Sequence, residues 1–84
     1  MSPEDPDTFL ASLTDTSLYS IGAYFADRHP DLLEDVIEQS VDIEHHGVET
    51  YADLEGITLQ SAFQTLVTGL AVRYYKAVAA DAPR

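Results

Sequence analysis

The residues from Gly56 to Val72 contain no charged side chain, although acidic residues are frequent in the rest of the chain. From this run onward, large apolar side chains recur at helical spacing, namely Leu59, Phe63, Leu66, Leu70 and Tyr74. A repeat of 3.6 residues predicts an amphipathic helix, which we place over residues 58–80. Thr58 is suited to be its N-cap, because a threonine hydroxyl accepts a hydrogen bond from the first turn.

The opposite face of this predicted helix is also nearly free of charge and consists of Thr65, Thr68, Val72, Tyr75 and Ala79. A helix that is apolar most of the way round is usually buried on more than one side. Two short helices from the same chain could hardly cover it fully, so the sequence predicts an oligomer, most simply a two-fold dimer. We expect the interface to contain Phe63, Leu66, Leu70, Tyr74 and Tyr75. A monomer with this face in water is the alternative.

Two further helices are predicted before this one. The first covers about residues 6–28, starts at Asp5–Pro6, and is open to a break near residues 14–17, where the sequence TDTS favours capping over helix interior. Pro30 ends it and opens a second helix over residues 30–46. The predicted fold is therefore all-α, a small bundle of three main helices in a single domain (6–82), with a disordered N-terminus at 1–5.

The segment between Ser40 and Gly56 allows two interpretations. We expect the second helix to stop near His46 with Gly47 just beyond its end, followed by a short helical turn near residues 50–55. A glycine inside a helix costs about 1 kcal/mol relative to alanine, which disfavours one continuous helix. The alternative is an α+β fold with a short hairpin at residues 41–52, since apolar and polar residues alternate there.

The charge balance is strongly acidic. Fifteen Asp and Glu face four Lys and Arg, giving a formal net charge of −11. In molar salt the Debye length falls to about 3 Å, which largely screens the resulting repulsion. Acidic surfaces with scarce lysine resemble those of cytoplasmic proteins from halophilic archaea, and this compositional resemblance implies a salt-rich cytoplasm. An ordinary acidic protein is the alternative.

The cysteine count, the chain length and the N-terminal sequence exclude several kinds of stabilising site and targeting segment. The chain has no cysteine, so disulfides and thiolate zinc sites are excluded, and a domain of 84 residues needs another source of stability, such as a partner subunit. The N-terminus MSPEDPDTF has neither a positive region nor an apolar segment, so we do not expect a signal peptide. Residues 56–72 are too short and too polar to span a bilayer. We expect a cytoplasmic protein with no membrane partner.

One cluster could bind a metal ion. Asp42, His45 and Glu49 lie at i, i+3 and i+7, and His46 lies four residues after Asp42. Carboxylate and imidazole ligands suit zinc, manganese or iron, and Asp-x-x-His resembles the Glu-x-x-His step of di-iron helical bundles. That resemblance covers four residues, and the helix at 58–80 offers none of the glutamates that such bundles require. The alternative is that both histidines are ordinary helix-surface residues.

Catalysis and nucleic-acid binding have weaker support. The sequence contains no Gly-rich phosphate loop and no nucleophile elbow, so we expect no enzyme and no cofactor. Residues 50–66 resemble a helix-turn-helix motif, but the second helix carries Gln60, Ser61 and Gln64 where phosphate-binding cations would be needed. With a net charge of −11, a nucleic-acid partner is not expected.

The main hypothesis is a non-catalytic, self-associating interaction or assembly module with an unidentified protein as a further possible partner.

Overall fold

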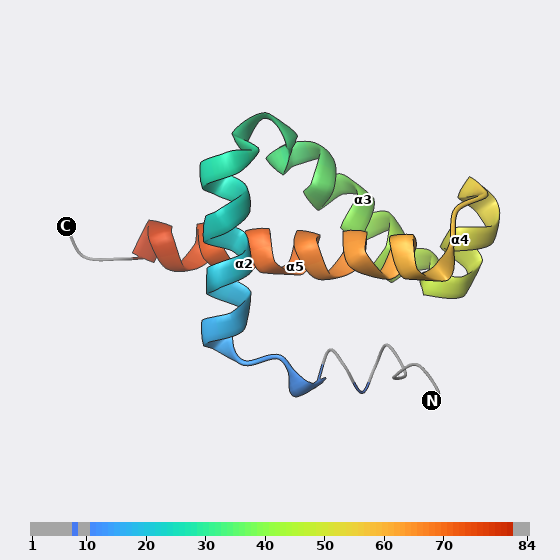
Figure 1. The fold of residues 1–84 in the computed structure, drawn as a ribbon, viewed down its shortest axis with the longest axis horizontal. Coiled ribbons are helices and arrows are strands. Elements are labelled where there is room, and N and C mark those ends of the chain that lie inside the picture. The colour runs from blue at the N-terminus through green and yellow to red at the C-terminus, as the bar shows by residue number, and fades with distance from the viewer. Residues whose placement is uncertain (1–7, 9–10, 82–84) are drawn as a thin grey trace.

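The computed structural model describes Thr8 and residues 11–81 and consists of helices (Figure 1). The elements after the first break are α2 (Asp15–Arg28), the 3-10 helix η1 (Pro30–Leu32), α3 (Leu33–His46), α4 (Val48–Glu55) and α5 (Leu59–Asp81). No strand occurs in the described part of the chain, so the all-α prediction is confirmed and the alternative hairpin at 41–52 is wrong. The bundle is not simply three-membered, because α4 is a helix of its own. The predicted helix start at Asp5–Pro6 and the predicted disorder at residues 1–5 lie outside the described residues.

The helix boundaries follow the capping chemistry of the sequence. Leu13 and Thr14 are not helical, and α2 restarts at Asp15 with Thr14 as N-cap, its Oγ1 accepting from the Ser17 N–H at 3.1 Å. The predicted break in the first helix is therefore confirmed. Thr58 caps α5 in the same way, with its Oγ1 accepting from the Ser61 N–H at 3.0 Å, as predicted.

Gly47 separates α3 from α4. Its backbone has φ 84° and ψ 152°, and its N–H donates to the Ile43 carbonyl at 2.7 Å. Side chains with a Cβ rarely adopt this positive φ, whereas glycine does so at little cost. The predicted helix end at His46 is confirmed, and the short turn predicted at 50–55 is the C-terminal part of α4.

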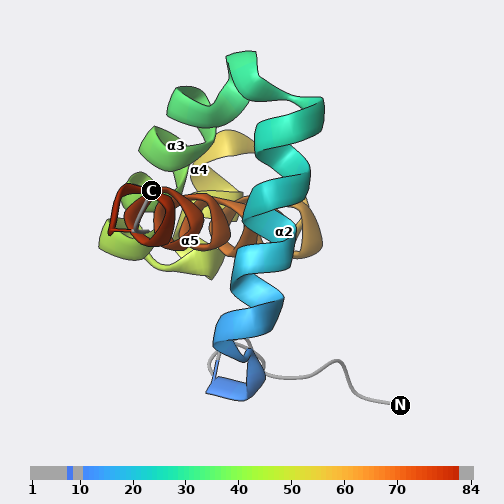
Figure 2. The same cartoon turned by 90° about the vertical axis from the view of Figure 1, so that its left-hand side faces the viewer.

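Helices α2 and α3 meet at η1, and α5 runs across both of them (Figure 1). Viewed almost along α5, the two lie on different sides of it (Figure 2). Gly22 of α2 lies against Ala71 and Tyr75, whereas Gly69 lies against Ser40 of α3. Residues 69 and 71 point in directions about 200° apart around a helix, so α5 is held from two sides by its own chain.

This arrangement changes the argument for a dimer. Val72, on the face that the sequence assigned to a partner subunit, is fully buried within the single chain. Thr65, Thr68 and Tyr75 on the same face are half-buried. The chain therefore covers the centre of this face itself, because small residues let α2 and α3 approach α5 closely, but it does not cover the face fully, since Ala79 is exposed.

The core is built mainly of small and medium side chains. One cluster joins α3, α4 and α5 and contains Ile43, Tyr51, Ala52, Ala62 and Leu66, with Val48 and Leu70 packed against it. The largest fully buried side chains are Ile43, Val72 and Ser40. Phe25 and Phe63 are only half-buried. Tyr51 thus contributes an aromatic ring to the core, whereas Phe25 and Phe63 lie at the boundary with solvent.

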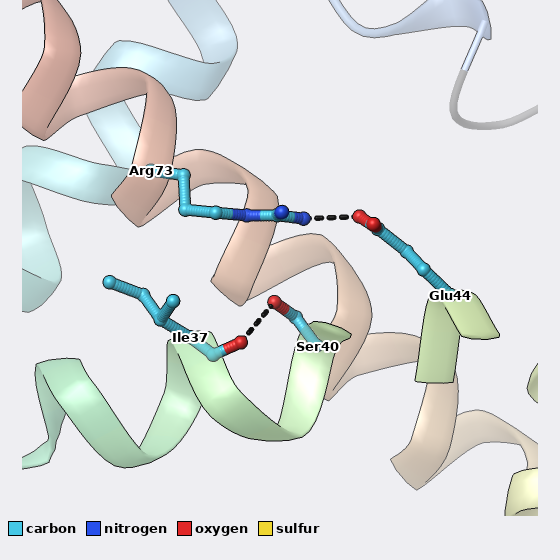
Figure 3. A network of polar contacts seen from close by, with 4 residues as sticks. All are labelled: Ile37, Ser40, Glu44 and Arg73. Atoms are coloured by element: carbon cyan, nitrogen blue, oxygen red, sulfur yellow. Dashed lines mark hydrogen bonds and ion pairs between the residues drawn. The ribbon is translucent and has the colours of Figure 1, made fainter. Parts of the chain in front are cut away.

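Two ion pairs connect α5 to α3. Arg73 extends from α5 past Ser40 to the carboxylate of Glu44, while the Ser40 hydroxyl donates to the Ile37 carbonyl at 2.8 Å (Figure 3). Lys76 Nζ lies 2.6 Å from Glu34 Oε1. Both cations of α5 are therefore already paired within the chain. Among the described helices, none has the length and apolar character needed to cross a membrane.

Candidate functional site

A shallow groove lies between α2 and the N-terminal half of α5. Ile21 and Phe25, four residues apart on α2, form one wall, since residues at i and i+4 share a helix face. The other wall comes from successive turns of α5 and contains Gln60, Phe63, Gln64, Val67 and Thr68. The hollow has a volume of about 540 Å³. We call these seven residues the α2–α5 groove.

A second, smaller hollow of about 280 Å³ continues from the groove towards α3. It shares Phe25, Gln64 and Thr68 with the groove and adds Val36 and Gln39 of α3 as well as Ser61 and Thr65 of α5. The Thr65 hydroxyl donates to the Ser61 carbonyl at 3.1 Å and is therefore used inside the helix. The side-chain amides of Gln60 and Gln64, in contrast, make no hydrogen bond within the described part of the chain.

The described residues that line both hollows are all uncharged, although 23% of the chain's residues are charged. It offers aromatic and aliphatic surface, amides and hydroxyls, but no carboxylate, imidazole, amine or thiol. Such a surface can exclude water and exchange neutral hydrogen bonds. It holds no group that could act as a general acid, general base or activated nucleophile.

The five predicted interface residues do not form one surface. Leu66 is 5% exposed and belongs to the core, with Leu70 packed beside it. Tyr75 is half-buried with its ring 5.0 Å from the ring of Tyr19 on α2. Only Phe63 lines the groove.

Two tyrosines are held in environments that oppose ionisation. Burial raises the pKa of Tyr51 above its usual value, and the carboxylates of Glu55 and Asp42 raise it further. For Tyr74, desolvation and the charge of Asp15 raise the pKa, and a hydrogen bond to the Asp15 carboxylate acts in the same direction. Asp15 belongs to the first turn of α2, so the environment of Tyr74 is set by residues of its own chain.

The predicted metal cluster is not assembled. Asp42, His45 and His46 lie at the end of α3, but the turn at Gly47 places Glu49 on α4, so the i, i+3, i+7 row is interrupted. His46 Nδ1 lies 3.1 Å from the Asp42 carbonyl and donates to it. Among the described residues, no three His, Asp or Glu side chains are close enough together to hold a metal ion.

The segment that resembles a helix-turn-helix does form α4, a tight turn and α5. Gly56 adopts the left-handed conformation at this turn, with φ 68° and ψ 30°. The exposed start of α5 presents Leu59, Gln60 and Ser61, none of which is a cation that could hold a phosphate. Arg73 and Lys76, the cations of this helix, are paired with glutamates of α3.

Comparison with known proteins assigns no relatives: no protein-family model matches the chain, and no curated protein or solved structure matches it significantly. The site therefore has to be interpreted from its own chemistry. Sequence reasoning did not select Ile21, Phe25 or Val67 as site residues, because it assigned apolar residues at helical spacing to the core. The signal that could have found the groove is the pair Gln60 and Gln64, two amides on one face of a charge-free helix.

Proposed function

We propose that this chain is a non-catalytic assembly module that pairs with a second copy of itself in a salt-rich cytoplasm. The proposal rests on one observation: the largest fully buried side chains are Ile43, Val72 and Ser40, while the phenylalanines Phe25 and Phe63 remain half-buried at the surface. Burial of apolar area contributes roughly 25 cal/mol per Å². A domain of this size gains little stability from a single core. Covering these two rings in a dimer would therefore add folding free energy that the monomer lacks.

The chemistry of the groove supports a binding role over a catalytic one. Its lining combines half-buried apolar side chains with neutral polar groups, which is the composition of the central part of many protein interfaces. None of the described residues that line it is titratable.

The acidic surface supports the salt-rich setting. Two copies, each with a net charge of −11, repel one another in dilute salt. At about 1 M salt the Debye length is about 3 Å, so that only charges in near contact still interact. Self-association should therefore strengthen as potassium chloride is added. Binding to a cationic partner would weaken over the same range.

The test is the mass of the wild-type chain in solution. We expect sedimentation equilibrium in about 2 M potassium chloride to give twice the 9.2 kDa of one chain. Native mass spectrometry from concentrated volatile salt should give the same stoichiometry. A monomer at all salt and protein concentrations would refute the proposal, and association that weakens with salt would indicate an attraction between opposite charges instead.

A further inference from the structure

We propose that the α2–α5 groove is the contact surface between the two copies, with the same groove facing itself across a two-fold axis. This inference rests on the proposed self-association and adds where it occurs and which residues carry it. The decisive residues are Ile21 and Phe25 of α2 and Phe63, Gln60, Gln64 and Val67 of α5.

Charge selects this surface for a homotypic contact. In a two-fold contact every residue meets a patch identical to its own, so a charged patch would meet its own sign. All seven described residues of the groove are uncharged, on a chain of net charge −11. A cationic partner would gain attraction by docking on the acids outside the groove. A second copy, in contrast, avoids repulsion only where acids are missing.

The polar groups of the groove are also complementary to themselves. A side-chain amide carries both a donor and an acceptor, so two amides related by a two-fold axis can satisfy each other. Gln60 and Gln64 lie one turn apart on the exposed side of α5 and make no hydrogen bond within the described chain. They are therefore available for such reciprocal bonds.

Apolar surface continues beyond the groove along α5. Leu59 is 45% exposed and lies one helical turn before Phe63, which itself lies four residues before Val67. This row gives a second copy aliphatic and aromatic area to cover around the amides. A second exposed apolar group surrounds the α4–α5 turn and consists of Leu54, Ile57 and Leu59. Asp53 and Glu55 flank Leu54 there, so two copies meeting at this turn would bring acids together.

The experiment compares two double variants that add the same charge. Gln60→Glu with Gln64→Glu places two carboxylates in the groove, and Thr50→Glu with Leu54→Glu places two on α4. All four positions are exposed, and both pairs have i, i+4 spacing, so the two variants are matched in added charge, spacing and exposure. Far-UV circular dichroism should show wild-type helicity for both.

In about 2 M potassium chloride, we expect the groove variant to raise the dimer dissociation constant at least about a hundredfold, because its carboxylates become desolvated beside their own copies. The α4 variant should remain a dimer. If the wild type is a dimer and the groove variant dimerises equally well, the groove is not the interface but the assembly proposal stands. Disruption by the α4 variant alone would place the contact at the α4–α5 turn.

Two further outcomes would also overturn the inference. A wild-type monomer in molar salt would refute the assembly proposal and the groove interface together. A wild-type monomer that carries a stoichiometric small-molecule mass in the native spectrum, lost in the groove variant, would instead make the groove a binding site for a neutral ligand.

Discussion

Gly22 and Gly69 set how closely α5 approaches its two neighbours. A Cβ at residue 69 would lie 2.1 Å from Ser40 Cβ and 2.3 Å from its Oγ. A Cβ at residue 22 would lie 2.4 Å from the Ala71 carbonyl oxygen. In both places a methyl group would have to displace a neighbouring helix, so these two positions determine how closely α2 and α3 pack on α5.

Gly69→Ala should lower the free energy of unfolding by about 1–3 kcal/mol, the usual cost of overpacking. The gain of about 1 kcal/mol in helix propensity does not compensate, since Ser40 already fills the space. Chemical denaturation in molar potassium chloride, followed by circular dichroism, measures this change. Adding Ser40→Gly removes the obstructing Cβ, so the double variant should be more stable than the sum of the single changes. Additive losses would show that the two residues do not touch.

Tyr51 makes the fold sensitive to alkali. Its pKa is raised in the folded chain by burial and then by Glu55 and Asp42. The stabilisation is therefore complete below the unfolded pKa of about 10 and is lost as the pH rises through the higher folded value. Tyr51→Phe should move the alkaline unfolding midpoint to higher pH, as followed by circular dichroism from about pH 8 to about pH 12. Tyr24→Phe, at a ring that is 55% exposed, should leave the midpoint unchanged. Equal midpoints for wild type and Tyr51→Phe would contradict the environment assigned to Tyr51.

Among the elements, α5 is the one on which the others assemble, because α2, α3 and α4 all pack on it. It starts after the turn at Gly56, and the Thr58 hydroxyl holds its first turn at 3.0 Å from the Ser61 N–H. Thr58→Ala should therefore cost about 1 kcal/mol of unfolding free energy, the typical value for a lost N-cap. Thr58→Ser keeps the hydroxyl and should cost much less in the same denaturation experiment. A similar loss in both variants would indicate that the threonine methyl group matters more than the cap.

For the whole molecule, the dominant long-range effect is charge. Asp31, Glu38 and Asp53 are exposed acids, and self-repulsion among such groups opposes the compact state. We expect the free energy of unfolding to rise between about 0.1 M and about 2 M potassium chloride as repulsion is screened. Replacing these three acids by their amides changes the net charge from −11 to −8 and should flatten that rise. An unchanged salt dependence would assign the effect to the salt's action on apolar hydration instead.

Local sequence signals predicted most of the secondary structure. Thr58, the stretch around Thr14 and the positions of Pro30 and Gly47 act within one or two turns of chain, and the structure confirms the boundaries at Thr14, Gly47 and Thr58. Pro30 opens the 3-10 helix η1, so α3 itself begins at Leu33 and not at residue 30 as predicted. The α4 segment was predicted too short, because a glycine on each side left few residues in which a helical period could show. The hairpin alternative was wrong because the segment is short as well: an alternation over a few residues does not distinguish a strand from a helix.

The sequence by itself determined the helical class, the main helix ends and the strongly acidic, cysteine-free character of the chain, because these depend on residue type and short-range spacing. Only the tertiary structure decided which faces are covered. The close contacts at Gly22 and Gly69 let α2 and α3 bury Val72 without a partner, and the Gly47 turn placed Glu49 on a different helix from His45. The same packing left Phe25, Phe63 and the two glutamines together at the surface. Such contacts depend on crossing positions between distant segments, which helical periodicity within each segment does not encode.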